Sequence, residues 1–205
     1  MRVLIILMIL FSSSNLLAFE DKSFRVSEEI FNNSHLEFTA HTNDGPFGSY
    51  LSMDIQYAPV KKLWKELEDR SGLKLKNRGE AHITIVTPVE YYRVLKEKID
   101  IREINEIAKK AKMQSMDFQI ECLGKFEKVL DKKNEGTYFI VINSKEILSL
   151  RKNIEKIYLS RGGDPKKFQA SNFYGHITVG FTKRDLHESD GAFKDKRSCF
   201  ASITH

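Results

Sequence analysis

Two copies of one tripeptide carry the residues best suited to chemistry in this 205-residue sequence. His82-Ile83-Thr84 occurs in the first half of the chain and His176-Ile177-Thr178 near its end. Successive side chains of a β-strand point to opposite faces, so each copy would present an imidazole and a hydroxyl side by side. The central isoleucine of each copy would point the other way, into the core.

Two such pairs facing one another suit the cleavage of a phosphodiester. One neutral imidazole removes a proton from the attacking hydroxyl or water, and the other, protonated, donates a proton to the leaving oxygen. The unperturbed pKa of histidine, about 6.5, allows both forms near neutrality. The hydroxyls of Thr84 and Thr178 can donate hydrogen bonds to the non-bridging phosphate oxygens, where charge builds up. We therefore predict that His82 and His176 act as general acid and base, without a metal or another cofactor.

Other interpretations of the tripeptides are weaker. Threonine is common in strands, so a single His-x-Thr would carry almost no information. The two copies, however, share their central residue, and each follows a predicted amphipathic helix. A metal site is disfavoured because no Asp or Glu lies within the tripeptides to complete a set of ligands.

The elements that would position the tripeptides follow from hydrophobic periodicity. Alternation predicts strands over 50–57, 81–87 and 175–182, and a strand-rich region over 116–142. Helical spacing predicts one helix that begins at Pro59, two segments between 88 and 116, and a long helix capped by Ser144. Since no linker rich in Pro, Gly or Ser interrupts this order, we expect one α+β domain.

The N-terminus has the layout of a secretory signal. Arg2 precedes an unbroken apolar run over 3–11, and Ala18 is the small residue at the expected cleavage point. A membrane anchor is the alternative, but a span takes about 20 apolar residues. We expect a cleaved signal peptide over 1–18 and hence export to the periplasm or the extracellular space. Residues 19–48 are then a polar lead-in, and residues 49–205 form the domain.

Composition and cysteine content say less about the function than the tripeptides do. Hydrophobic residues make up 41% of the chain and charged residues 30%, which indicates a folded domain rather than a disordered one. The formal net charge of +5 suits a ligand that bears phosphate. The two cysteines, Cys122 and Cys199, can form one disulfide in an exported protein. Two buried free thiols are the alternative.

The segments around both tripeptides resemble the 2H phosphoesterase superfamily, in its Swiss Army Knife RNA-repair-like branch. The resemblance rests on 78–84 (RGEAHIT) with Pro88, and on 174–182 (YGHITVGFT) with the run from Arg184 to Asp195. One departure is Gly175, which stands where many relatives have proline. The resemblance implies a bilobal α+β fold with pseudo-two-fold symmetry. In that fold, two antiparallel-rich sheets flank a central cleft, with helices outside.

The resemblance also implies an activity. The expected reaction is hydrolysis of 2′,3′-cyclic phosphates or related phosphodiester ends of nucleotides or RNA, with Thr84 and Thr178 on the phosphate. Two alternatives remain: an exported nucleotide- or RNA-binding module without turnover, and an RNA-cleaving nuclease that forms cyclic phosphate. The expected partner is thus a nucleotide or an RNA end. No protein partner is implied, and no stable membrane insertion is expected once the signal is cleaved.

Three further residues are candidates for the cleft. His187 lies in a polar segment and could line the cleft or orient a catalytic histidine, although a structural turn is the more ordinary role. Tyr174 could stack on a base or belong to the core. Arg184 could attract phosphate or be a solvated surface residue. The remaining histidines lie outside any motif and are expected at the surface: His35, His41 and His205.

Overall fold

The computed structural model describes residues 23–43 and 45–205. The expected signal peptide over 1–18 lies outside the described residues. Within them, no helix is long and apolar enough to cross a membrane. The strands are β1 (Ser23–Arg25), β2 (His41–Thr42), β3 (Ser49–Ile55), β4 (Ala81–Val86), β5 (Gln119–Leu130), β6 (Lys133–Asn143), β7 (His176–Phe181) and β8 (Cys199–Thr204). The helices are α1 (Tyr57–Ser71), α2 (Pro88–Glu90, continued by a π-helical turn over Tyr91–Leu95), α3 (Ile101–Lys110) and α4 (Lys145–Ser160).

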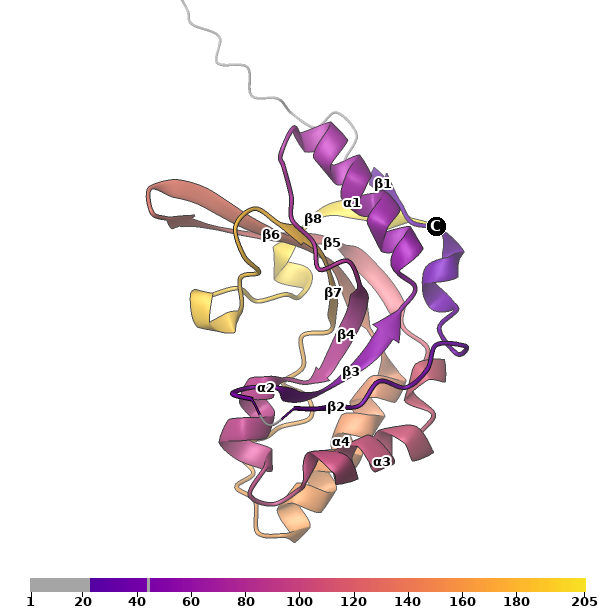
Figure 1. The fold of residues 1–205 in the computed structure, drawn as a ribbon, viewed down its shortest axis with the longest axis vertical. Helices are drawn as coiled ribbons and strands as arrows, with labels where there is room; N and C mark the ends of the chain where they lie inside the picture. The colour runs from indigo at the N-terminus through magenta and orange to yellow at the C-terminus, as the bar shows by residue number, and fades with distance from the viewer. Residues whose placement is uncertain (1–22, 44) are drawn as a thin grey trace, which may run out of the picture.

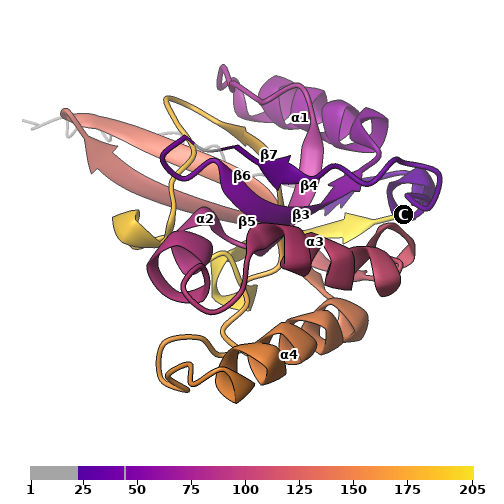
Figure 2. The same ribbon diagram turned by 60° about the horizontal axis from the view of Figure 1, so that its bottom comes forward.

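These elements form the α+β domain that the sequence predicts, but with one sheet instead of two. The eight strands follow the order β1-β8-β5-β6-β7-β4-β3-β2. Neighbouring strands are antiparallel except β1 and β8, which are parallel. The expectation of two separate sheets fails because β7 pairs with both β6 and β4, which joins the two halves. The sheet curves strongly, with α1 towards one end of the molecule and α3 and α4 towards the other (Figures 1 and 2).

The polar lead-in contributes to this sheet more than expected. It supplies both outermost strands, β1 and β2, although the sequence predicts no strand before residue 50. Phe24, Val26 and Ile30 are almost fully buried in the main core. The described part of the lead-in is therefore packed with the rest of the domain.

A single large core holds the helices against one face of the sheet. It contains Ile83 and Ile177, the central residues of the two tripeptides, together with apolar side chains of α1, α3 and α4. Helix α4 begins as predicted, because the hydroxyl of Ser144 accepts a hydrogen bond from the backbone N–H of Ile147. The opposite face of the sheet carries a small second cluster around Phe139, formed with Cys122 and Val141.

Arg151 of α4 ties together the segments that lead to the two motif strands. Its side chain is only 1% exposed and pairs with Glu90 of α2 at 2.8 Å. The guanidinium also donates to the carbonyl of Ile85, at the end of β4. It donates further to carbonyls in the loop that precedes β7, those of Gln169, Ala170 and Asn172. A buried arginine with this many acceptors fixes the ends of both strands from one point.

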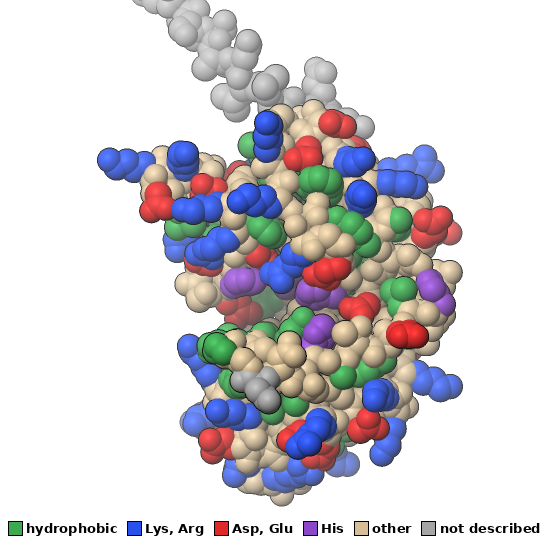
Figure 3. All heavy atoms as spheres, viewed as in Figure 1, with side chains coloured by type: hydrophobic (Ala, Val, Ile, Leu, Met, Phe, Trp, Pro, Cys, Tyr) green, Lys and Arg blue, Asp and Glu red, His purple; other side chains and the backbone are tan. Residues whose placement is uncertain are grey.

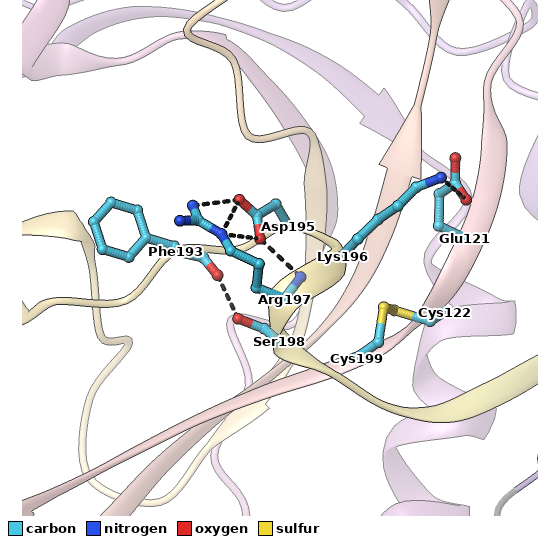
Figure 4. Close-up of a disulfide and its surroundings, with 8 residues drawn as sticks. All are labelled: Glu121, Cys122, Phe193, Asp195, Lys196, Arg197, Ser198 and Cys199. Carbon is cyan, nitrogen blue, oxygen red and sulfur yellow. Dashed lines mark hydrogen bonds and ion pairs between the residues drawn. A yellow bond between two sulfur atoms is a disulfide. The ribbon is translucent and has the colours of Figure 1, made fainter.

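Cys122 and Cys199 form a disulfide that joins β5 to β8 (Figure 4). The segment before Cys199 is held by further contacts around this bond. Lys196 pairs with Glu121 of β5 at 3.0 Å, and the hydroxyl of Ser198 donates to the carbonyl of Phe193. The disulfide therefore fixes the end of the irregular segment that precedes β8.

Candidate active site

The two tripeptides lie on adjacent strands. Strands β4 and β7 pair antiparallel, with Ile83 directly opposite Ile177. Side chains that lie opposite one another share a face of the sheet. Counting one residue outward from the isoleucine pair places His82 opposite Thr178 and, likewise, His176 opposite Thr84.

The result is a local two-fold arrangement of four polar side chains. Both isoleucines are fully buried, whereas all four histidine and threonine residues are half-buried. The two histidines occupy diagonal positions of the strand pair, for which the typical Cα–Cα separation is about 7–8 Å. In the space-filling view, histidine, basic and acidic side chains surround a hollow in the middle of this face (Figure 3).

The ring of His82 is oriented by Glu80. Its Nδ1 lies 2.7 Å from Oε2 of Glu80, so Nδ1–H donates to the carboxylate and Nε2 is the ring nitrogen left for a ligand. Burial disfavours the charged form of Glu80, but the hydrogen bond and the charge of His82 outweigh it and lower the pKa of Glu80 below 4.5. The ionised carboxylate therefore places a negative charge beside the His82 ring.

The ring of His176 is oriented by the backbone. Its Nδ1 lies 2.7 Å from the carbonyl oxygen of Tyr174, which can only accept, so Nε2 is again the free nitrogen. The ring packs edge-to-face against Phe139, with 6.0 Å between centroids. Burial and the nearby ammonium of Lys194 lower the pKa of His176 well below 6.5. His176 is therefore neutral at pH 7 and available as a base.

Thr178 is connected to a group of charged residues beyond the end of β7. Its hydroxyl donates to Oδ2 of Asp185 at 3.3 Å. The same carboxylate accepts from Lys194 at 2.8 Å and from Arg78 at 3.2 Å. Burial disfavours the charge of Asp185, but Lys194 outweighs that effect, and the pKa of the carboxyl group lies below 3.8.

A further histidine stands next to the site, which corrects the expectation that His41 is a surface residue. His41 is half-buried, and its ring stacks on Tyr50 with 3.9 Å between centroids and 13° between planes. The ring of Tyr50 in turn lies 6.5 Å from that of His82. The imidazole Nε2 of His41 is 3.1 Å from the hydroxyl of Ser52, and burial lowers the pKa of His41 below 6.5.

The three further cleft candidates lie at the edge of the site. Tyr174 contributes its carbonyl to His176, while its ring packs against Phe193 at 5.9 Å. Arg184 and the exposed His187 line a pocket of about 450 Å³ together with Arg78 and Asp185. The guanidinium of Arg184, however, is bound by both carboxylate oxygens of Asp190, at 2.6 and 2.7 Å. None of the three contacts an imidazole ring nitrogen or a threonine hydroxyl of the tripeptides through its own side chain.

Four residues that contact the motif side chains or support them have no individual role among the expectations from sequence, although all four lie in the runs that carry the family resemblance. Glu80 could have been found, because it lies two positions before His82 and a strand places such residues on one face. Asp185, Lys194 and Arg78 meet only in the folded chain, and their spacing in the sequence gives no signal. Among the described residues, no group of three or more His, Cys, Asp or Glu side chains is placed to hold a metal ion.

The two His-x-Thr strands are paired, and neither imidazole Nε2 has a hydrogen-bond partner in the part of the chain that the structure describes. This arrangement is a site of the two-histidine phosphoesterase class. In agreement, the Swiss Army Knife 2H phosphoesterase domain matches residues 49–187, which is more than half of the chain. The protein therefore belongs to this family, and family membership indicates a hydrolase that acts on phosphoesters. Searches of curated proteins and of solved structures find no match.

Proposed function

We propose that the protein hydrolyses 2′,3′-cyclic phosphates, or related phosphodiester ends of nucleotides or RNA, without a metal. The observation that carries the proposal is the pairing of Ile83 with Ile177, which sets both His-x-Thr motifs on one face of adjacent strands. Each histidine has Nδ1 engaged and Nε2 free, as a proton-transfer group requires. The local two-fold symmetry of the motifs about the Ile83–Ile177 pair also supports the proposal of two related lobes.

The surroundings of the two histidines support different roles for them. His176 is neutral at pH 7 and is the base that removes a proton from the attacking water. His82, next to the ionised Glu80, is the acid that protonates the leaving ribose oxygen. As water adds to phosphorus, the bond to one ribose oxygen breaks and a nucleoside monophosphate forms. The hydroxyls of Thr84 and Thr178 stabilise the charge on the non-bridging oxygens.

We further propose that the protein is exported and acts on nucleotides or RNA fragments outside the cytoplasm. The N-terminal sequence over 1–18 motivates this location. The disulfide between Cys122 and Cys199 supports it, because such bonds persist mainly in oxidising compartments. Locating the protein by cell fractionation, with and without residues 1–18, tests this part of the proposal. Retention of both forms in the cytoplasm would contradict it.

Product analysis tests the proposed reaction against the two alternatives. The protein, purified under non-reducing conditions, is incubated in EDTA with 2′,3′-cyclic nucleotides and with a short RNA, and products are followed by ³¹P NMR. The proposal expects conversion of the cyclic phosphate to a monophosphate. Cleavage of the RNA with accumulation of cyclic ends would instead identify a nuclease. Binding of these ligands without any conversion would identify a binding module.

A further inference from the structure

Arg78 is held beside the site in a way that the proposed reaction does not yet use. The segment that carries it is tied to the end of β7 by two backbone hydrogen bonds between Lys76 and Phe181, of 2.8 and 2.9 Å. Between this tie and β4 the chain turns at Gly79, whose φ of +75° is a conformation that glycine adopts readily. The turn is closed by a bond of 2.9 Å from the N–H of Gly79 to the side chain of Asn77.

The side chain of Arg78 is oriented by one carboxylate. A single guanidinium nitrogen donates to Asp185 at 3.2 Å, and the side chain is 44% exposed. An arginine has five N–H donors in a planar fork. The remaining donors of Arg78 have no hydrogen-bond partner among the described residues and border the pocket of about 450 Å³.

Asp185 is itself fixed from behind. Lys194 donates to its other carboxylate oxygen at 2.8 Å, and the side chains of this pair are 4% and 6% exposed. Lys194 comes from the segment anchored by the disulfide (Figure 4 shows its neighbours in that segment). Glu188, which is exposed, also lies within electrostatic range of Lys194. A buried carboxylate held by a buried ammonium is a rigid support for a second cation.

The carboxylate also links Arg78 to the phosphate position. Asp185 accepts the hydroxyl of Thr178 at 3.3 Å, a long distance for an O–H···O bond, whose usual length is about 2.7–2.8 Å. The hydroxyl can therefore turn from Asp185 to a bound phosphate at little cost. Arg78, one carboxylate away, is then within reach of the same phosphate group, and a guanidinium fork matches phosphate oxygens well.

We propose that Arg78 is a phosphate-binding residue of this site, oriented by Asp185, and that Lys194 is a positioning residue that acts through Asp185. The inference rests on the proposed function, because it takes a phosphoryl group between the two histidines as the ligand. It adds a recognition element for the anion to the two His-x-Thr motifs.

The test compares the affinity for two probes, inorganic phosphate and adenosine 2′-monophosphate, measured by isothermal titration calorimetry. Arg78→Met is expected to weaken binding about tenfold or more, because a charged hydrogen bond is lost, whereas Arg78→Lys retains part of the affinity. Arg161→Met is the matched control. Its side chain is 43% exposed and bound to Glu103, on the helices away from the site.

Lys194 has a separate test with its own control. Lys194→Met is expected to weaken binding in the wild-type background, but to add little in the Arg78→Met background, because it acts through the same contact. Lys109→Met removes a 49% exposed lysine on α3 and is expected to have no effect. Circular dichroism shows whether each variant folds. If Lys194→Met does not fold, the exposed Arg78 variants still decide the central claim.

The outcomes separate this inference from the proposed function. If the wild-type protein hydrolyses no cyclic phosphate but Arg78→Met still loses about tenfold in phosphate affinity, the reaction is wrong and the anion site stands. If hydrolysis depends on both histidines while Arg78→Met binds phosphate like Arg161→Met, the inference alone fails. A wild-type protein that binds neither probe would also overturn it.

Discussion

Replacing Glu80 by glutamine tests how the site divides proton transfer between its histidines. The Nδ1 of His82 and the Oε2 of Glu80 are 2.7 Å apart, and an amide oxygen at this position still accepts the bond. The variant therefore keeps the ring orientation of His82 but removes the negative charge beside the ring.

The size of the effect follows from the exposure of the carboxylate. A hydrogen bond to a charged group contributes about 1.5–3 kcal/mol. The side chain of Glu80 is 49% exposed, so solvent screening favours the lower end of this range. A loss of about 1.5 kcal/mol corresponds to about a tenfold lower kcat near neutral pH.

The assay is steady-state turnover of a 2′,3′-cyclic nucleotide between pH 5 and 8. Glu106→Gln is the control, because this carboxylate is exposed and, among the described residues, pairs only with Lys109 on α3. In a His82→Ala background, Glu80→Gln is expected to cost nothing further, since Glu80 acts through the imidazole. An equal loss in both backgrounds would refute this role for Glu80.

Three further predictions concern pH dependence and stability. Burial and Lys194 lower the pKa of His176, so we expect kcat/KM to fall on the acid side with a midpoint well below pH 6.5. A midpoint at or above pH 6.5 would contradict the role of His176 as a base that is neutral in the free enzyme. Replacing both Cys122 and Cys199 by serine removes a crosslink between residues 77 positions apart, and we expect the free energy of unfolding in urea titrations to fall by about 4–5 kcal/mol. A loss under about 1 kcal/mol would show that the disulfide contributes little to stability. Arg151→Met leaves Glu90 and several carbonyls without their donor, and we expect it to lower the free energy of unfolding by about 3–5 kcal/mol. Arg161→Met, at an exposed ion pair, is expected to change it by less than about 1 kcal/mol. Equal losses in the two variants would contradict the role of Arg151.

The motif strands could be predicted because their signal is local. His82 and Thr84 alternate with buried neighbours, as do His176 and Thr178, and the cap at Ser144 is equally local. The burial of Arg151 could also have been predicted. It lies four residues after Ile147 and three before Ile154, within the apolar stripe of α4, where a charged residue needs partners.

The rest of the sheet and site depends on contacts between distant segments. No strand is predicted after residue 182, yet β8 forms there because it pairs with β5 and β1. The single sheet follows from the pairing of β7 with β4 and β6, which periodicity does not specify. Asp185 meets Arg78 across 107 positions of sequence, so no local pattern places them together.

The central claim is that His82 and His176 together carry out proton transfer. Its most direct test is turnover of a 2′,3′-cyclic nucleotide in EDTA by the wild-type protein, His82→Ala, His176→Ala and the control His35→Ala, an exposed histidine bound to Gln56. The account predicts activity that survives the chelator, falls about 10²–10⁴-fold in each motif variant, and is unchanged in the control. Wild-type activity in either motif variant, or its abolition by EDTA, would contradict the account.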